Sequence, residues 1–548
     1  MDRDTRSRLE GHRLDDVGAV DNADVDALFT GTMSRRELVR RGSAFGLSAS
    51  TIGALLAACG SNSPGTTTGK PKRGGTLRAG FSGGGSTDTL NGLGAVTTVS
   101  ICYASLLFDS LITYDADARM HMALAEEITP NKDATIWTIR VKRGVMFHDG
   151  KELTAEDVIY TFQQIANPKS PQSGASLLSG IELSKMKKVD KYTAEIPFAA
   201  PYSTFPEGLF TAAGFPIVPV DFDPKHPVGT GPFEYESFAA GVQAEFARNP
   251  NYWQSGLPYV DAVKISTVTD ESAQVNGLTS GTYDIVNALS AASKASVENA
   301  GSKVAISDGG AYVPFTMRTD SGVFSDVRVR QAFRLMVDRP AMREAVFAGH
   351  GALGNDVFCI WSPEYDDSLP QRQQDLDRAK SLLRQAGQQD LHVELVTSPL
   401  APGAVQSAQV MAEQAKGAGV RVNLSNVPVS TFYGPNYLKW GFAQDYWAFE
   451  PFFAQVATSS LPNSPFNECR FTDEQFIRLN RQALASTSEE KRTEIAHEMQ
   501  RILYDRGGYI IPFFAPLIDG YTTRVGGVTQ SKLGLPFNSF DLKSLWLA

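Results

Sequence analysis

The chain has 548 residues, of which 42% are hydrophobic and 20% charged, and a formal net charge of −9 at pH 7. This composition is ordinary for a globular protein, and the length is sufficient for two or three lobes with cores of their own. Such a mildly acidic chain lacks the basic surface that nucleic-acid binding requires, so we expect no nucleic-acid partner.

The first distinctive segment is SRRELVRRGSAFGLSASTIGALLAAC, residues 34–59. Arg35 and Arg36 open a cationic stretch, which is followed by an uncharged run rich in glycine, serine and alanine. That run is short and weakly apolar for a membrane-spanning helix, which needs about 20 apolar residues, and it lacks the polar face of a core helix. The segment resembles a twin-arginine export signal that ends in a lipobox at Cys59.

This resemblance implies that residues 1–58 are a leader and signal peptide, and that the mature chain begins at a lipidated Cys59. Two or more acyl chains give stable membrane anchoring, so we expect an exported protein that is anchored by lipid and faces the periplasm or the cell exterior. Because 33 residues precede Ser34, a long leader and a mistaken start site both stay open. No later stretch reaches ~18 uninterrupted apolar residues, so no further span is predicted.

The remaining cysteines are Cys102, Cys359 and Cys469, and no CxxC pair suggests zinc or redox chemistry. Outside the cytoplasm one disulfide is expected, for which we favour Cys359 with Cys469, although sequence alone does not fix the connectivity. The histidines form neither an HxxxH nor an HExxH motif, so we predict no metal site and no cofactor.

The elements of the folded part begin after a flexible tether, residues 59–73. GGTLRAG predicts a strand, and TIWTIRVKRGVMFHDG predicts a strand that turns at Asp149-Gly150. In LTAEDVIYTFQQI, Thr154 and Asp157 have the spacing of a capping box ahead of an amphipathic helix.

Farther along, HVELVTSPL, AVQSAQVMAEQAKGAG and VRVNLSNV predict a strand–helix–strand unit. DLDRAKSLLRQAG and FTDEQFIRLNRQALA predict two more amphipathic helices, the second capped by Thr472. The pattern is mixed α/β.

Catalytic motifs are missing from the sequence. The glycines of FSGGGS are not followed by the Lys-Ser/Thr of a phosphate loop, and GTGP has proline where a helix would begin. His148-Asp149 lies in a turn, where we expect a structural role, and the G-x-S-x-G elbow of a serine hydrolase is missing. We therefore predict that the protein is not an enzyme.

Several motifs stand in the order found in one protein family: GGTLRAG, GVMFHDGKELTAEDVIYTF, HPVGTGPFEYESFAAGVQAEFARNPNYWQSGLPYVDAVKI and GVFSDVRVRQAFRLMVDRPAM. Together they resemble the family 5 extracellular solute-binding proteins of ABC importers, which include oligopeptide- and dipeptide-binding proteins. The resemblance runs from about residue 74 to the C-terminus.

The resemblance implies a two-lobed, periplasmic-binding-protein-like α/β fold with mixed sheets, an interlobe cleft and a hinge. Lobe I would combine residues 74–112, 228–319 and 512–548, with a subdomain inserted at 113–227, and lobe II would span 320–511. A monomer would close over its solute and deliver it to an ABC permease and ATPase complex.

The resemblance also implies ligand-binding residues. In peptide-binding members an acidic residue near KWGFAQDYWAFEPFFAQ pairs with the α-ammonium group of the ligand, and Asp445 and Glu450 both fit this place. The other candidates are Tyr446, Trp447, Phe449, Trp361, Arg318 and Tyr103. Arg318 stands where the family often has asparagine, and it either meets a carboxylate of the solute or forms a surface salt bridge.

The solute is the open part of this reading. A peptide or peptide-like solute is our first choice, and a sugar, an opine or a metal complex is the alternative. An exported hydrolase and a surface adhesion or signalling module are the rival classes.

Overall fold

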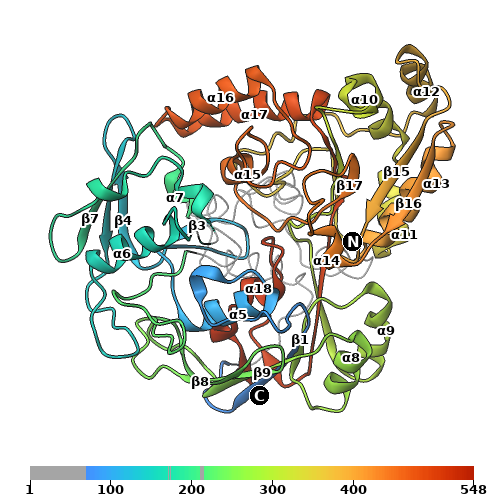
Figure 1. Ribbon diagram of the computed structural model, residues 1–548. Helices are drawn as coiled ribbons and strands as arrows, with labels where there is room; N and C mark the ends of the chain where they lie inside the picture. Colours follow the sequence, from blue (N-terminus) through green and yellow to red (C-terminus); the bar gives the residue numbers. More distant parts are fainter. Residues whose placement is uncertain (1–69, 171, 173, 210–214) are drawn as a thin grey trace, which may run out of the picture. The chain divides into compact units, whose positions relative to one another are not determined.

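Three β-sheets of four or more strands organise the computed structural model, which describes residues 70–548 except 171, 173 and 210–214 (Figure 1). The predicted export and lipidation residues Arg35, Arg36 and Cys59 lie outside the described residues. They stay predictions.

The largest sheet has seven strands, drawn from three distant segments of the chain. In spatial order its strands are β12 (Lys303–Ser307), β20 (Leu517–Tyr521), β11 (Ile285–Val286), β1 (Thr76–Phe81), β10 (Ala262–Thr267), β9 (Gln243–Arg248) and β8 (Phe233–Ala239). β1 is the strand predicted from GGTLRAG, and it runs parallel to β10 and β11. Its Leu77, Ala79 and Phe81 are fully buried because every second side chain of a strand faces the same side. The helices that accompany this sheet are η2 (Gly92–Gly94), α5 (Thr98–Leu107), α8 (Glu271–Thr279), η5 (Ala291–Ser293), α9 (Lys294–Asn299), α18 (Pro536–Phe540) and η7 (Leu542–Ser544).

A four-stranded sheet lies within the segment predicted as the inserted subdomain. Its order is β4 (Ala125–Pro130), β5 (Ile136–Val141), β7 (Thr193–Pro197) and β6 (Lys187–Lys188), and the hairpin β2 (Ile112–Tyr114) with β3 (Met120–Met122) precedes it. α6 (Ala155–Ile165) begins at the predicted capping box, in which the side chains of Thr154 and Asp157 each accept a backbone N–H of the other's position. The short helices η3 (Ala175–Leu178), η4 (Leu183–Lys185) and α7 (Phe205–Gly208) complete this part of the chain.

The GTGP segment joins this inserted part to α5. A Cβ atom at Gly229 or at Gly231 would stand only 1.9 or 2.3 Å from the backbone of Leu107, so only glycine fits at these two positions. His148 accepts the backbone N–H of Gly229 at 3.2 Å through Nδ1, and its Nε2 lies 3.0 Å from the carbonyl of Gly231. The histidine therefore has the structural role that its turn predicts.

A five-stranded sheet forms the centre of the second lobe. Its order is β16 (Arg421–Asn426), β15 (His392–Thr397), β17 (Phe442–Gln444), β13 (Phe315–Met317) and β18 (Tyr509–Ile510). The predicted strand–helix–strand unit is confirmed, since β15 and β16 run parallel and α13 (Ala404–Lys416) joins them. The other helices are η6 (Val323–Ser325), α10 (Val327–Met336), α11 (Arg339–Phe347), α12 (Leu376–Gln385), α14 (Val429–Phe432), α15 (Phe452–Ser459), α16 (Glu474–Leu484) and α17 (Glu489–Arg506).

α16 and α17 pack side by side, as Figure 1 shows at the top of the view. The prediction that Thr472 caps α16 is wrong, because Asp473 is the N-cap residue and its carboxylate accepts the N–H of Phe476 at 2.9 Å. The same carboxylate is 2.6 Å from Nε of Arg506 in the last turn of α17. Aspartate thus satisfies the helix end and the neighbouring cation together, which threonine cannot do.

The motif DVRVRQAFRLMVDRPAM surrounds a buried carboxylate. Asp356 accepts two bonds from Arg339, at 2.7 and 2.8 Å, and one from Arg372 at 2.7 Å. The guanidinium of Arg334 donates to the carbonyls of Tyr509 and Gly507. A buried charge must be paired, so the arginines of this motif have a structural role and not a role in ligand binding.

The chain crosses between the seven- and five-stranded sheets after β12 and again before β20. The crossing segments are tied together by the bond from the N–H of Ala515 to the carbonyl of Ala311 at 2.7 Å. Two small sheets consist of β14 (Ala352–Leu353) with β19 (Phe513–Phe514), and of β21 (Val525–Gly526) with β22 (Trp546–Leu547). Because β13 belongs to the five-stranded sheet, the first crossing lies before Phe315, ahead of the limit at residue 319 that we predicted for lobe I.

Candidate functional site

The segment from β17 to α15 contains five of the eight predicted ligand residues and runs beside the first crossing. Trp447 and Tyr312 exchange two backbone hydrogen bonds, at 2.9 and 3.0 Å. Asp445 follows β17 directly, and its N–H donates to the carbonyl of Pro314 at 3.3 Å. The hinge and the predicted ligand segment are therefore one hydrogen-bonded unit.

Asp445 is buried and held by two tyrosines of the preceding helix and loop. Its Oδ1 accepts the hydroxyl of Tyr433 at 2.8 Å and its Oδ2 that of Tyr437 at 2.9 Å. Burial raises the pKa of Asp445 above its ordinary value, although these bonds act in the opposite direction. Tyr433 is 44% exposed, whereas Asp445 itself is only 3% exposed.

A second carboxyl group, that of Glu468, lies beside Asp445. Its Oε1 accepts Nε1–H of Trp447 at 2.9 Å, and its Oε2 accepts the hydroxyl of Tyr509 at 2.5 Å. Burial, and then the charge of Asp445, raise the pKa of Glu468 well above its usual range. Two carboxyl groups this close disfavour each other's ionisation, so the pair titrates as a unit.

The sequence reasoning did not find Glu468, Tyr433 or Tyr437. The two tyrosines stand four residues apart just before Asp445, which is a visible signal for side chains on one face. Glu468 has no such signal, because it reaches Asp445 only through the folding of α15 and the loop that follows it.

Glu450 lies apart from this pair. Its Oε2 accepts the hydroxyl of Thr458 at 3.0 Å, across the first turns of α15. Burial raises its pKa to about 7. Tyr446 stands between Asp445 and Glu450 in the sequence, and burial raises its pKa to about 12.

Trp361 and Phe449 lie at the boundary between the two lobes. Nε1–H of Trp361 donates to the carbonyl of Asp308 at 3.0 Å, and Nζ of Lys532 lies 4.9 Å from the centre of its ring. The ring of Phe449 meets that of Tyr114 edge to face at 6.4 Å. Both aromatic side chains thus contact residues on the first lobe's side of the crossings.

Arg318 and Tyr103 contact neither acid of the carboxyl pair. Arg318 donates to both oxygens of Asp320, at 2.8 and 2.6 Å, which is the salt bridge that the sequence left open. Tyr103 is fully buried and packs on Phe246 and Phe238 under the seven-stranded sheet. We leave both out of the site.

The predicted disulfide between Cys359 and Cys469 is wrong, because Cys102, Cys359 and Cys469 are all buried free thiols. Cys102 belongs to the core around the seven-stranded sheet, whereas the other two belong to the core around α15 and α17. The sulfur of Cys469 packs against Gly508 instead of meeting another sulfur. Burial raises the pKa of all three thiols, which disfavours the reactive thiolate.

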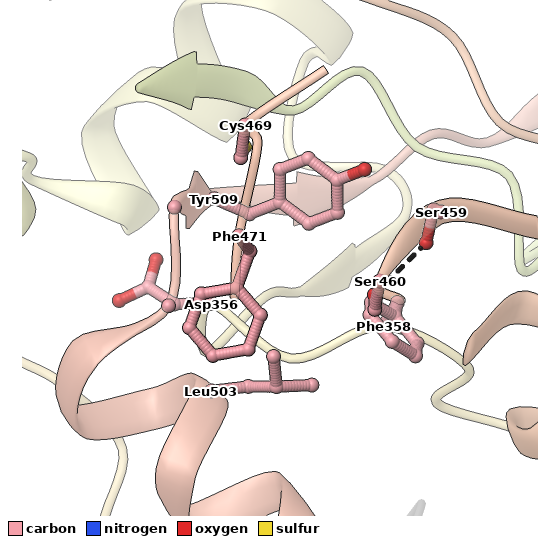
Figure 2. Close-up of a pocket in the computed structure, with 10 residues that line it drawn as sticks. Asp356, Phe358, Ser459, Ser460, Cys469, Phe471, Leu503 and Tyr509 are labelled. Atoms are coloured by element: carbon pink, nitrogen blue, oxygen red, sulfur yellow. Dashed lines mark hydrogen bonds between the residues drawn. The ribbon is translucent and has the colours of Figure 1, made fainter. Parts of the chain in front are cut away.

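A cavity beside Cys469 is too small for a solute (Figure 2). It is lined by Phe358, Phe471, Leu503 and Tyr509 among others, and the hydroxyls of Ser459 and Ser460 lie 3.0 Å apart there. Its volume of about 10 Å³ is that of one water molecule. Two cavities that are lined by several distant segments of the chain have volumes of about 420 and 400 Å³ and are large enough for a small molecule.

Comparison with known proteins places the chain. Residues 119–465 match the model of the bacterial extracellular solute-binding proteins, family 5. The chain belongs to this family. It is therefore a family 5 solute-binding protein, whose known members are extracellular or periplasmic binding proteins and not enzymes.

This family 5 protein is similar to two curated relatives and to one solved structure. Heme-binding protein A of Haemophilus influenzae is 28% identical over 75% of this chain and 82% of its own length. The glutathione-binding protein GsiB of Salmonella choleraesuis is 24% identical over 84% of this chain and 93% of its own. The Helicobacter pylori periplasmic binding protein DppA, solved with the peptide STSA, has a TM-score of 0.75 at 18% identity, covering 87% of this chain and 98% of that one. This last likeness confirms the predicted fold class.

The described part of the family 5 protein has neither a membrane-spanning helix nor a cluster of potential metal ligands. Among residues 70–548, leaving out the few that are not described, no helix is both long and apolar enough to span a membrane. Within the same part of the chain, no group of three or more histidine, cysteine, aspartate and glutamate side chains is arranged to hold a metal ion.

Proposed function

We propose that this family 5 protein captures a peptide or peptide-like solute by its free ammonium group, as the binding component of an ABC importer. The observation that carries the proposal is the buried pair Asp445–Glu468, beside the exposed ring of Tyr433. An ammonium group at the pair would favour the ionised form of a carboxyl group and donate to it, and the tyrosine hydroxyls would accept its remaining N–H bonds.

The relatives support this solute class without deciding it. The curated relative GsiB is named for glutathione, which has an α-ammonium group and peptide bonds. Heme-binding protein A is named for a solute without an ammonium group, so a non-peptide solute is the alternative that the test must separate.

The capture step would couple the site to closure of the lobes. Trp447 and Asp445 share backbone bonds with the crossing segment, so a ligand at the pair would act directly on the hinge. The lobes that we propose keep the predicted limits, with the first crossing moved ahead of Phe315. A permease would then recognise the closed monomer.

We further propose that the chain is exported through Arg35 and Arg36 and anchored by lipid at Cys59. The support is the order of the signal in the sequence. The anchor would keep the binding protein at the membrane face that holds its permease and ATPase.

The deciding experiment compares solutes with and without a free amine. We expect trialanine and glutathione to bind the purified chain in calorimetry and to raise its melting temperature, because a ligand of the folded state stabilises it. N-acetyl-trialanine should bind at least tenfold more weakly. Asp445→Asn should remove this difference, and the exposed Asp390→Asn is the matched control.

Three outcomes would contradict the proposal. Equal binding of acetylated and free peptides would exclude ammonium recognition at the pair. Binding of a sugar, haem or a nickel complex in place of every peptide would assign the non-peptide alternative, and turnover of a solute would show an enzyme.

A further inference from the structure

The cavity of about 400 Å³ lies where the inserted subdomain meets the second lobe, away from the Asp445–Glu468 pair. One wall comes from β2, β3, β4, β5 and α7, and the other from residues 362–364, Phe449, Pro451 and the start of α17. Ser203 bridges the same two parts, since its N–H donates to the carbonyl of Leu484 at 2.8 Å and its hydroxyl to that of Ala483 at 3.0 Å. The cavity is thus complete only when the two parts are in contact.

Its walls are mainly apolar. The larger apolar and aromatic residues are Tyr114, Met120, Met122, Ile128, Trp137 and Phe449. Such walls favour a ligand with a hydrocarbon or flat stem, and methionine adapts to stems of different shape.

The charged residues of the lining are mainly acidic. Glu207 on α7, Glu364 and Glu489 are acids, and Arg492 is the one basic residue in the lining of this described cavity. Glu364 is only 6% exposed, and one of its oxygens accepts the hydroxyl of Ser362. When all are ionised, the acids therefore exceed the base in charge.

Glu207 has a buried oxygen without a hydrogen-bond partner among the described residues. That oxygen is Oε2, and the other, Oε1, is 3.8 Å from Nη2 of Arg492, beyond hydrogen-bond distance. Burial, and then the charge of Glu364, raise the pKa of Glu207 to about 8, while Arg492 acts in the opposite direction and Glu489 in the same one. An orphaned buried acceptor of this kind is costly unless a donor reaches it from the cavity.

We propose that this cavity is a second subsite, which binds a guanidinium or ammonium group on an apolar stem, such as the side chain of an arginine or lysine in the solute. The cation would donate to Oε2 of Glu207 and to Glu364, and its stem would lie between Trp137, Met122 and Phe449. Because the two acids belong to different parts, such a cation would also hold the cavity closed. The assignment of the cation to a side chain of a peptide solute rests on the proposed function. The binding of a cation in this cavity does not depend on it.

The direct test uses a small probe with a neutral isostere. Butylguanidinium chloride and butylurea have nearly the same shape and differ in charge. At pH 8.5, where Glu207 is largely ionised, we expect calorimetry to show butylguanidinium binding at least tenfold tighter than butylurea to the purified chain. At pH 6 this preference should fall, because the cation must displace the proton of Glu207.

Two isosteric variants and one control localise the binding. Glu207→Gln and Glu364→Gln should each lower the affinity for butylguanidinium at least tenfold and leave that for butylurea unchanged. Glu413→Gln removes an exposed acid of α13 that pairs with Lys416, and it should change neither. Thermal unfolding shows that each variant is folded. Equal affinity for the two probes, or unchanged affinity in both glutamine variants, would overturn the proposal and leave the Glu207–Arg492 pair a structural contact.

A peptide arm separates this inference from the proposed function. Ala-Arg-Ala has a charged guanidinium group where Ala-citrulline-Ala has a neutral urea group. We expect the arginine peptide to bind at least tenfold more tightly, and each glutamine variant should remove this preference. If peptides bind without this preference and butylguanidinium does not bind, the subsite is wrong and the proposed function stands. If butylguanidinium binds as expected and no peptide does, the proposed function fails and the cation site stands.

Discussion

At the scale of single residues, the protein has several buried acidic side chains. Glu207, Glu450 and Asp519 each have their pKa raised to between about 7 and about 8, with burial as the first cause. Asp519 accepts two backbone N–H groups, whereas Glu450 accepts the hydroxyl of Thr458. An acid with so little support is the simplest place to measure the effect of burial on stability.

Replacing Glu450 with glutamine should flatten the dependence of stability on pH. In the folded chain this carboxyl keeps its proton up to about pH 7, whereas in the unfolded chain it loses the proton near the ordinary value of 4.5. The folded state binds more protons between these values, so the free energy of unfolding falls as pH rises through them. We expect Glu450→Gln to match the parent near pH 4.5 and to exceed its stability at pH 7.5 by about 1–3 kcal/mol.

Urea unfolding at several pH values measures this difference. Glu394→Gln, at an exposed position of β15, is the control and should leave the pH dependence unchanged. A parallel shift of the whole profile in Glu450→Gln would mean that Glu450 acts through packing rather than through its proton.

At the scale of elements, an interaction between helix ends connects α16 and α17 in the second lobe. Asp473 caps α16 and pairs with Arg506 at the end of α17, so one carboxylate serves two helices. A carboxylate that caps one helix and pairs with a partly buried guanidinium group stabilises the folded state through both interactions.

Asp473→Ala should lower the free energy of unfolding by about 1–2 kcal/mol, because it removes an N-cap bond and an ion pair. Thr472→Ala, at the exposed neighbouring position, should change it by less than about 0.5 kcal/mol. Chemical unfolding of the two variants side by side provides the measurement. The reverse order would restore the cap that we first predicted from the sequence.

At the scale of the whole molecule, the prediction concerns the place of the protein in the cell. If Cys59 carries lipid, the chain expressed in a bacterium with a twin-arginine pathway should fractionate with membranes and incorporate labelled palmitate. Cys59→Ser should lose the label, because the thiol that would carry the lipid is missing. Substituting lysine for both Arg35 and Arg36 should leave the precursor in the cytoplasm. Palmitate labelling of Cys59→Ser would place the lipid elsewhere.

The sequence was sufficient for the elements but not for the contacts between them. β1, the strand–helix–strand unit and the Thr154–Asp157 box follow from local periodicity and capping, and the structure confirms them. The carboxyl pair, the orphaned oxygen of Glu207 and the free thiols depend on which distant segments meet. Glu207 and Glu364 are 157 positions apart, and no periodicity in one sequence reports such a meeting.

The Asp445 region shows the same limit within one segment. Asp445 became a candidate because peptide-binding members of the family have an acidic residue near this point. The structure places two tyrosines and Glu468 around it. The resemblance also suggests Tyr103 and Arg318 as candidate ligand residues. Their surroundings, an aromatic core and a salt bridge, come from packing that the sequence does not state.

The position of β20 sets a condition on how the protein is made. This strand, residues 517–521, lies between β12 and β11 inside the seven-stranded sheet, although about 500 residues are synthesised before it. While the chain is still on the ribosome, that sheet has a gap flanked by two unpaired strand edges. The first lobe therefore finishes folding only after synthesis is nearly complete, and until then those edges are the part of the nascent chain that most needs protection from aggregation.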